Sequence, residues 1–289
     1  MKLRWPEGFR CTACASSQTW KTGRGLLMCR KCGRQHSVTA GTIFHRSRLP
    51  LKTWFRAMWW LTNQKTGVSA LGLQRLLGFG SYETAWTLLQ KLRRAMVRPG
   101  RDRLRGKVEV DESFVGGFCP EGGRRHMGNK ALVAMAVEVK GVKMGRVRLH
   151  RVPDSSSRSL IGFVKSVVEP GSSVITDGLP SYAGLSKEGY LHHAYVVQGK
   201  TRNPKLATVL LPYVHRISSL FKRWLLGTHQ GAVSREHLDY YLDEFTFRFN
   251  RRTSTHRGQL FYRLIQQSVA IEPVPYKKII IKPQQIGVA

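Results

Sequence analysis

Acidic residues are scarce in this 289-residue chain: 17 Asp and Glu stand against 48 Lys and Arg, which leaves a formal net charge of +31. This excess is far more than solubility requires, and it points to a polyanionic partner, above all nucleic acid. The sequence also lacks an apolar run long enough to span a bilayer, and the residues after Met1 lack the apolar region of a signal peptide. Membrane binding and secretion are therefore not expected, whereas a hydrophobic content of 42% is enough to build folded cores.

Four of the five cysteines form two close pairs, Cys11 with Cys14 and Cys29 with Cys32. Each pair can aim two thiolates at one point from a tight turn, and two such turns complete the tetrahedral sulfur cage that zinc prefers. Two disulfides are the alternative, disfavoured because no secretory signal precedes the pairs. The spacing predicts a zinc ribbon within residues 1–45. Because four thiolates leave no coordination position open, we expect this zinc to be structural.

A helical segment is expected over residues 46–100, where apolar residues recur at helical spacing. Residues 78–81 form a glycine turn between two helices, and Ser81 is the expected N-cap of the second one. The pattern resembles a helix-turn-helix, and a helical hairpin that only braces the ribbon explains the spacing equally well. The basic end of the second helix favours DNA contact. The candidate DNA-binding residues of this segment are Arg93 and Arg94.

The remainder of the chain alternates strand and helix patterns, with an α/β domain expected over residues 105–265 and a C-terminal tail over residues 266–289. Three meandering strands, a crossover helix and a fourth strand beside the first are the order of an RNase H-like fold. The predicted fold class is therefore α/β, an RNase H-like domain preceded by a zinc ribbon and a helical segment. The expected strands cover residues 107–115, 131–139, 147–152 and 173–176, and the expected helix begins at the serine-rich residues 154–157.

Two aspartates of this domain are candidates for catalysis. Asp111 lies in a β-branched strand, where Asp costs stability unless it is needed, and Asp177 follows an apolar strand, at the end where open α/β sheets place their ligands. If the two strands pair, the carboxylates can share divalent magnesium or manganese ions. Such ions activate the attacking oxygen and stabilise the leaving oxygen in phosphodiester chemistry. Taken singly, Asp111 is also explained as a satisfied strand residue, and Asp177 as part of a turn with Gly178.

A third group is expected on the amphipathic segment 214–224, where His215 and Lys222 share one face at helical spacing. His215 can complete the metal site, and Lys222 can hold a phosphate. A half-buried histidine and a solvated basic face are equally good explanations. The helix expected next, over residues 235–250, ends in a basic cap. Its alternative carboxylates are Glu236, Asp243 and Glu244, and the DNA-binding candidates in this half of the chain are Lys222, Arg223, Arg251 and Arg252.

With these residues in place, nearly the full length of the chain resembles bacterial insertion-sequence transposases of the ISXO2-like type, which carry a zinc ribbon and a DDE integrase-like domain. The resemblance implies that Asp111 and Asp177 are the first two members of the catalytic triad and that Lys222 contacts the transposon end. Family members commonly carry Glu, or an amide, seven residues before that lysine, where this chain has His215. Histidine can bind a metal or position water, and a lost carboxylate can also mark an inactive copy. The most specific stretches are residues 108–117, 176–178, 222–229 and 241–252.

We therefore expect a DNA transposase that binds the ends of its insertion sequence and carries out metal-dependent strand cleavage and strand transfer. Two ends must be cut in concert, so a homodimer or larger assembly on DNA is expected, in the bacterial cytoplasm and associated with the nucleoid. A zinc-ribbon DNA-binding regulator with a non-catalytic RNase H-like domain is the alternative, and a nuclease without joining activity is a nearer one. The two strand aspartates favour the enzyme, and His215 favours the regulator.

Overall fold

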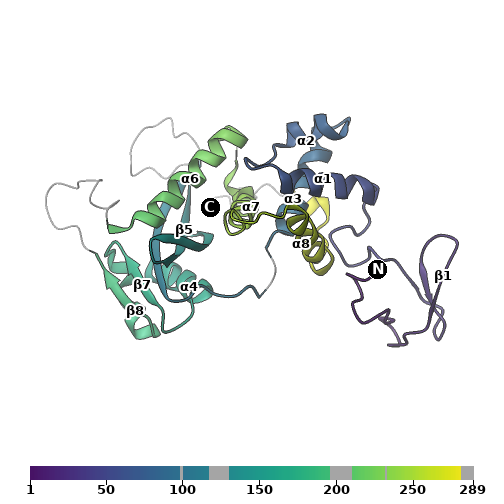
Figure 1. Ribbon diagram of the computed structural model, residues 1–289, viewed down its shortest axis with the longest axis horizontal. Coiled ribbons are helices and arrows are strands. Elements are labelled where there is room, and N and C mark those ends of the chain that lie inside the picture. Colours follow the sequence, from purple (N-terminus) through teal and green to yellow (C-terminus); the bar gives the residue numbers. More distant parts are fainter. Residues whose placement is uncertain (98–99, 117–129, 196–209, 232, 281–289) are drawn as a thin grey trace, which may run out of the picture. The chain divides into compact units, whose positions relative to one another are not determined.

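The chain forms two compact units in its computed structural model (Figure 1). The first unit combines Met1–Pro99 with Ser254–Ala289, and the second is Gly100–Thr253. The first unit therefore joins the two ends of the chain. Within the described residues, no helix has both the length and the apolar character that crossing a bilayer demands. The structure describes residues 1–97, 100–116, 130–195, 210–231 and 233–280.

The first unit begins with a small antiparallel sheet in the order β1-β2-β3. Phe9 and Leu27 pack with Cys11 and Cys29 in its core, so the first cysteine of each pair is buried, whereas Cys14 is half-buried and Cys32 is exposed. With so few apolar side chains, this part of the chain depends on its cysteines for stability. The strands are β1 (Thr19–Lys21), β2 (Leu27–Cys29) and β3 (Gln35–His36).

Both cysteine pairs make the same backbone turn. The N–H of Ala15 donates to the carbonyl of Cys11 at 2.9 Å, and the N–H of Gly33 donates to the carbonyl of Cys29 at 3.0 Å. Ala15 and Gly33 both adopt positive φ, 56° and 69°. Glycine adopts this left-handed conformation without strain and alanine does not, so the backbone of the first turn is the more strained of the two.

Helices make up much of the rest of the first unit. Those within residues 46–100 follow the predicted apolar spacing, whereas the helices over residues 257–270 and 276–279 come from segments that the sequence pattern assigns to the α/β domain and to a tail. Ser69 and Ser81 cap two of them by accepting the N–H groups of Gly72 and Glu83, and Gly78 ends the first of this pair in the left-handed conformation with φ 67°. The predicted glycine turn between two helices is thus confirmed, and the two helices pack on each other. The helices are α1 (Leu51–Asn63), α2 (Ala70–Leu77), α3 (Tyr82–Arg94), α8 (Arg257–Ala270), which packs on α1, and α9 (Tyr276–Ile279).

The second unit is built on a five-stranded mixed sheet in the order β6-β5-β4-β7-β8. β4, β5 and β6 form an antiparallel meander, and β7 then pairs parallel to β4 on its other side. This is the strand order predicted for an RNase H-like domain. The third strand begins at Lys143 rather than Val147, and β8 was not predicted. The strands are β4 (Lys107–Val115), β5 (Ala131–Lys140), β6 (Lys143–Val152), β7 (Ser173–Thr176) and β8 (Leu191–Ala194).

Helices contact this sheet through two separate cores. α6 and α7 pack on the core that contains Val133 and Met135, while α4 packs on the core that contains Val108 and Val110. The alternation of strand residues therefore decides which helix each side chain meets. The remaining elements are α4 (Ser157–Val167), the 3₁₀ helices η1 (Pro180–Glu188) and η2 (Arg235–His237), α6 (Pro212–His229) and α7 (Leu238–Phe249).

A buried ion pair holds the β5–β6 hairpin together. Glu138 is 1% exposed, and it accepts hydrogen bonds from the guanidinium of Arg146, at 2.5 to 3.1 Å, and from the N–H of Arg105 at 3.2 Å. A Cβ added at Gly145 would lie 2.8 Å from the Cβ of Glu138. Gly145 is therefore required by close packing, not by backbone conformation.

The end of α7 is bound to the outer strand β6 by a side-chain amide. Asn250 Oδ1 accepts the N–H of Val147 at 2.7 Å, and Asn250 Nδ2 donates to the carbonyl of Val147 at 3.1 Å. Arg252 donates to the carbonyls of Gly145 and Met144 on the same strand. The basic cap predicted after this helix is thus joined to the sheet edge.

Candidate active site and zinc site

The register of two strands brings the candidate aspartates to one end of the sheet. β4 and β7 run parallel with Glu109 opposite Ile175, and two residues further along each chain lie Asp111 and Asp177. The predicted pairing of these strands is confirmed. Asp177 also makes a local turn, because its Oδ1 accepts the N–H of Leu179 at 3.1 Å. Asp177 therefore belongs to a turn, as its position before Gly178 suggests, and it also lies at the end of the sheet near Asp111.

The surroundings of Asp111 disfavour its negative charge. Burial and the nearby carboxylates of Glu112 and Asp177 raise the pKa of Asp111 to about 8, and the ammonium of Lys222 lowers it only in part. Its side chain is 14% exposed. Carboxylates gathered in this way are stabilised when a cation is added to the site.

Glu112 points to the opposite face of β4, as strand alternation predicts. The hydroxyl of Tyr182, a fully buried residue of η1, donates to Glu112 Oε2 at 2.7 Å. Burial also raises the pKa of Glu112. Sequence reasoning missed Tyr182, although a tyrosine within an apolar segment commonly needs a partner for its hydroxyl.

Glu109 fixes the start of α6 beside these carboxylates. It is 3% exposed, and its Oε2 accepts the backbone N–H groups of Tyr213 at 2.8 Å and Val214 at 2.9 Å. A carboxylate in this position satisfies donors that a helix start leaves unpaired, and it interacts favourably with the helix dipole. Glu109 therefore links β4 directly to the helix that carries the third candidate residue.

His215 follows in the first turn of α6, and it lies against the aspartates. Its Nδ1 is 3.8 Å from Asp111 Oδ2. Its Nε2 is buried and has no hydrogen-bond partner among the described residues. Burial lowers the pKa of His215, so the neutral form, which is the one that binds metals, is favoured. The structure thus brings His215 next to Asp111, and its role as the third member of the triad stays a prediction.

Lys222 lies on the same face of α6, as predicted. Its Nζ donates to Ser113 Oγ at 2.6 Å, and its charge acts on Asp111. Ser113 and Asp111 share one face of β4. Arg223 is exposed next to Lys222, so α6 offers one cation bonded to the site and another directed to solvent.

These side chains offer the kinds of ligand that a divalent cation takes, although among the described residues only the four cysteines gather closely enough to form a ready metal site. Asp111 and Asp177 supply hard oxygen ligands, and His215 adds a buried ring nitrogen without a protein partner among the described residues. The alternative carboxylate Glu244 is different, because it is fully buried on α7 and accepts a hydrogen bond from Arg248 at 2.8 Å. Glu244 is therefore satisfied as part of the fold.

The four paired cysteines form a second candidate metal site. Their sulfur atoms all lie within 4.8 Å of one another, with 3.5 Å between Cys11 and Cys32 and 3.5 Å between Cys14 and Cys29. These thiols are free rather than joined as disulfides. Tetrahedral zinc with Zn–S bonds of about 2.3 Å requires sulfur atoms a little under 4 Å apart, so the cluster fits zinc.

Backbone amides prepare part of this cluster for a metal. The N–H groups of Cys32 and Lys31 lower the pKa of the Cys29 thiol to about 6, against the effect of burial. The sequence did not indicate His36, whose Nε2 lies 3.3 Å from Cys11 Sγ. A ring nitrogen at this distance can donate to a thiolate and orient it.

The arginines predicted to bind DNA differ in their surroundings. Arg93 is 1% exposed and donates to the carbonyl of Val68, so in this conformation its guanidinium does not reach a phosphate. Arg94, beside it, is half-buried. Arg251 and Arg252 stack on the rings of Phe247 and Phe249, with guanidinium carbons 4.2 and 4.0 Å from the ring centroids. Helical position alone does not distinguish these environments.

Comparison with known proteins assigns this arrangement to a class. Residues 103–250, about half of the chain, match the ISXO2-like transposase domain, and residues 1–35 match the transposase zinc-ribbon domain. Both matches describe transposases, and together they cover the zinc cluster and the candidate active site. The chain belongs to the ISXO2-like transposase family.

Two individual proteins resemble the chain. An uncharacterized protein in transposable element ISH50 of Halobacterium salinarum is 27% identical over 264 residues, which cover 86% of this chain and 87% of that protein. A chain of the simian T-cell lymphotropic virus intasome, solved in complex with PP2A regulatory subunit B56 gamma, has 13% identity and a TM-score of 0.35. That alignment covers 73% of this chain and 74% of the solved one.

Proposed function

We propose that this protein is a DDE-type DNA transposase that binds the ends of its insertion sequence, cleaves a strand there and joins it to target DNA. The observation that carries the proposal is the approach of His215 Nδ1 to Asp111 Oδ2, 3.8 Å, beside the parallel strand that ends at Thr176, just before Asp177. The family supports transposase function, and the geometry supports the assignment of that function to Asp111, Asp177 and His215. A scaffold has no evident need to gather two carboxylates and a neutral histidine at one sheet end.

Each residue has a role in this proposal. Asp111 and Asp177 hold the divalent cations, magnesium or manganese, and His215 completes the ligand set. When bound, such ions polarise the phosphodiester and activate the attacking water or 3′-hydroxyl. Lys222 holds a phosphate of the transposon end next to Asp111. Glu109 and Tyr182 position α6 and Glu112 without touching the DNA.

DNA is the proposed partner because of the charge as well as the family. A net charge of +31 favours binding to a polyanion by counterion release. We assign recognition of the terminal repeats to the first unit and strand chemistry to the second. Both ends of an element must be cut together, so the active form is a dimer or larger assembly on DNA, within the nucleoid.

The proposal is tested by incubating the protein with labelled DNA that carries its own element ends, in magnesium or manganese. Wild type should give cleaved and joined products. Asp111→Asn should lose both and still bind DNA, because the amide cannot replace the charged ligand. Asp239→Asn is the matched control, since Asp239 is an exposed carboxylate that pairs with Arg151; it should keep full activity.

His215→Glu separates the proposal from its alternatives. If wild type is active and His215→Ala is not, His215 belongs to the working site. Activity in His215→Glu together with a silent wild type identifies a damaged copy. DNA binding without metal-dependent cleavage in either protein would overturn the proposal and favour a regulator, and cleavage without joined products would favour a nuclease.

A further inference from the structure

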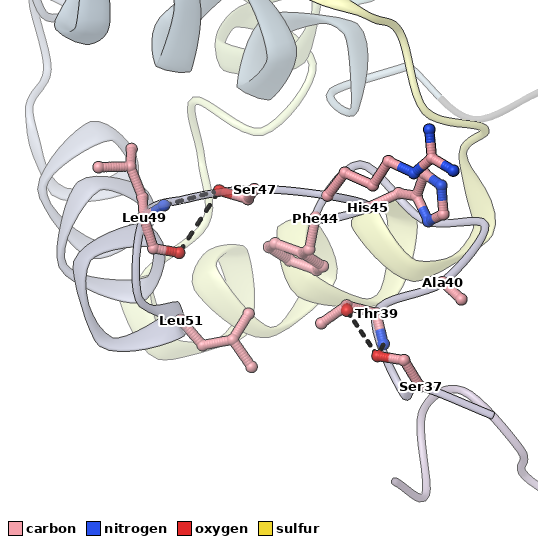
Figure 2. Close-up of a pocket in the computed structure, with 9 residues that line it drawn as sticks. Ser37, Thr39, Ala40, Phe44, His45, Ser47, Leu49 and Leu51 are labelled. Carbon is pink, nitrogen blue, oxygen red and sulfur yellow. Dashed lines mark hydrogen bonds between the residues drawn. The ribbon is translucent and has the colours of Figure 1, made fainter. Parts of the chain in front are cut away.

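A cavity beside α3 lies in the first unit, whereas the carboxylates of the candidate active site belong to the second. Its volume is about 360 Å³, and its wall combines the segment before α1 with one face of α3. We call residues 44–49 the strap. A neighbouring cavity of about 380 Å³ shares Arg46, Ser47 and Leu49 with the first one, so the strap borders both cavities. Figure 2 shows the strap with the residues that line the second cavity.

Hydrogen bonds hold the strap in one conformation. Ser47 Oγ accepts the indole N–H of the buried Trp54 at 2.9 Å. It also accepts the N–H of Leu49 at 3.1 Å (Figure 2). The N–H of Ser47 donates to the carbonyl of Phe44 at 3.1 Å, and the ring of Phe44 packs edge-on against Trp54. The strap is thus anchored to α1 and is a preformed wall of the cavity.

Cations gather on this wall without anions to balance them. Arg46, Arg48 and Lys91 all line the cavity. Within the described part of the chain none of their side chains forms an ion pair or a hydrogen bond, not even with Glu83, the single carboxylate of the lining. Burial lowers the pKa of Lys91, which shows that its charge is partly desolvated without compensation. An anion in the cavity would supply that compensation.

A hydroxyl group of α3 is also unsatisfied. Thr87 Oγ1 is buried and has no hydrogen-bond partner among the described residues, and it lies one helical turn before Lys91 on the cavity wall. A hydroxyl can donate to a phosphate oxygen. The cavity therefore offers both charge and a neutral donor to the same kind of ligand.

Arg46 has a strained backbone. Its φ is 50°, in the left-handed region that L residues with a Cβ rarely adopt. Glycine would take this conformation without strain. Strain of this kind commonly persists where a side chain serves a function, and here the side chain is an exposed guanidinium at the border of the two cavities.

We propose that Arg46, Arg48, Lys91 and Thr87 form a binding site for the phosphate backbone of duplex DNA. The strap and α3 would then bind the duplex jointly. The inference rests on the proposed function only in taking DNA as the polyanion. The phosphate contacts are thus assigned to cations that are open to a ligand and not to Arg93, which is buried. Phosphate contacts of this type position a duplex and do not read its sequence.

The test is the affinity for a fluorescein-labelled duplex of random sequence, measured by anisotropy over a series of salt concentrations, without magnesium or manganese and with zinc retained. Arg46→Gln, Arg48→Gln and Lys91→Gln should each weaken binding by on the order of tenfold and lower the slope of log affinity against log salt by about 0.9. Lys140→Gln, which removes an equally exposed charge from the end of β5, should leave the slope unchanged. Equal losses in all four variants, or no loss in the first three, would overturn the site.

Arg46→Gly gives a second readout that does not depend on damage to the fold. The substitution relieves the positive φ, so the protein should melt at a higher temperature while its DNA affinity falls as in Arg46→Gln. A stabilised protein with wild-type affinity would refute the inference. The binding assay contains no magnesium or manganese, so a protein that fails to cleave DNA can still give this result. If the transposase is active but the three variants bind DNA normally, only this site is refuted.

Discussion

Glu109 is the residue on which the position of His215 depends, and we predict that Glu109→Ala loosens the first turn of α6 and inactivates the site. The backbone donors of this turn can be followed one by one. Pro212 has no N–H, those of Tyr213 and Val214 bond to Glu109, and that of His215 starts the ladder within the helix. Two donors therefore rely on one buried side chain.

The magnitude follows from these two bonds. A buried N–H left without a partner costs roughly 1 to 3 kcal/mol, so Glu109→Ala should lower the free energy of unfolding by about 3 kcal/mol when water reaches one of the two. Glu109→Gln keeps an acceptor oxygen at the same reach. It also removes a charge that burial already penalises, since burial raises the pKa of Glu109. We expect the glutamine variant to lose about 1 kcal/mol or less.

Urea unfolding of wild type and both variants measures this difference, and hydrogen exchange at Tyr213 and Val214 locates it. The alanine variant should exchange faster at these two amides and lose strand transfer, because His215 is no longer held against Asp111. The glutamine variant should retain both properties. If Glu109→Ala is as stable as wild type, with both amides still protected, then the donors find other partners and our account of α6 is wrong.

Three further predictions concern other parts of the chain. Cys29→Ser should release the bound zinc and unfold the ribbon, whereas the second unit keeps its fold; plasma emission spectrometry and circular dichroism check this, and unchanged metal content would rule out the zinc assignment. Ala15→Gly should stabilise the first cysteine turn by about 1 kcal/mol, because φ there is 56°; an unchanged or lower melting temperature would contradict the strain. Burial raises the pKa of Glu138, but hydrogen bonds from Arg146 outweigh it and the net shift is downward. The stability from Glu138 is therefore present above its unfolded pKa of about 4.5 and is lost as pH falls through the folded value. The free energy of unfolding of Glu138→Gln should depend less on pH below about 5 than that of wild type. If the two proteins lose stability equally as pH falls, this ion pair is not the cause of the loss.

Much of the architecture was accessible to sequence reasoning because it depends on local pattern. Cysteine spacing identified the ribbon, and β-branched runs with a crossover helix between them gave the order of four strands. β8 could not be found in the same way. It has four residues, Leu191–Ala194, most of them exposed, and two of the four are histidines. A short parallel edge strand carries no apolar alternation.

The site was only partly accessible for a different reason. Asp111 and Asp177 follow from strand pattern and position. The roles of Glu109 and Tyr182 depend on contacts between residues far apart in sequence, which no local pattern reports. The burial of Arg93 is similar, because an arginine at the basic end of a helix is normally solvated. Instead, the guanidinium of Arg93 donates hydrogen bonds inside the fold, to Gln90 Oε1 and to the carbonyl of Val68.

The side chain of Asn250 has a consequence for how copies of this protein meet. An outer strand offers its free N–H and C=O groups to any extended segment that comes near. At Val147 the side-chain amide of Asn250 already forms hydrogen bonds to both groups, as a neighbouring strand would. Arg252 occupies the carbonyls just before it. A second copy of the chain therefore cannot extend the sheet at this point of β6.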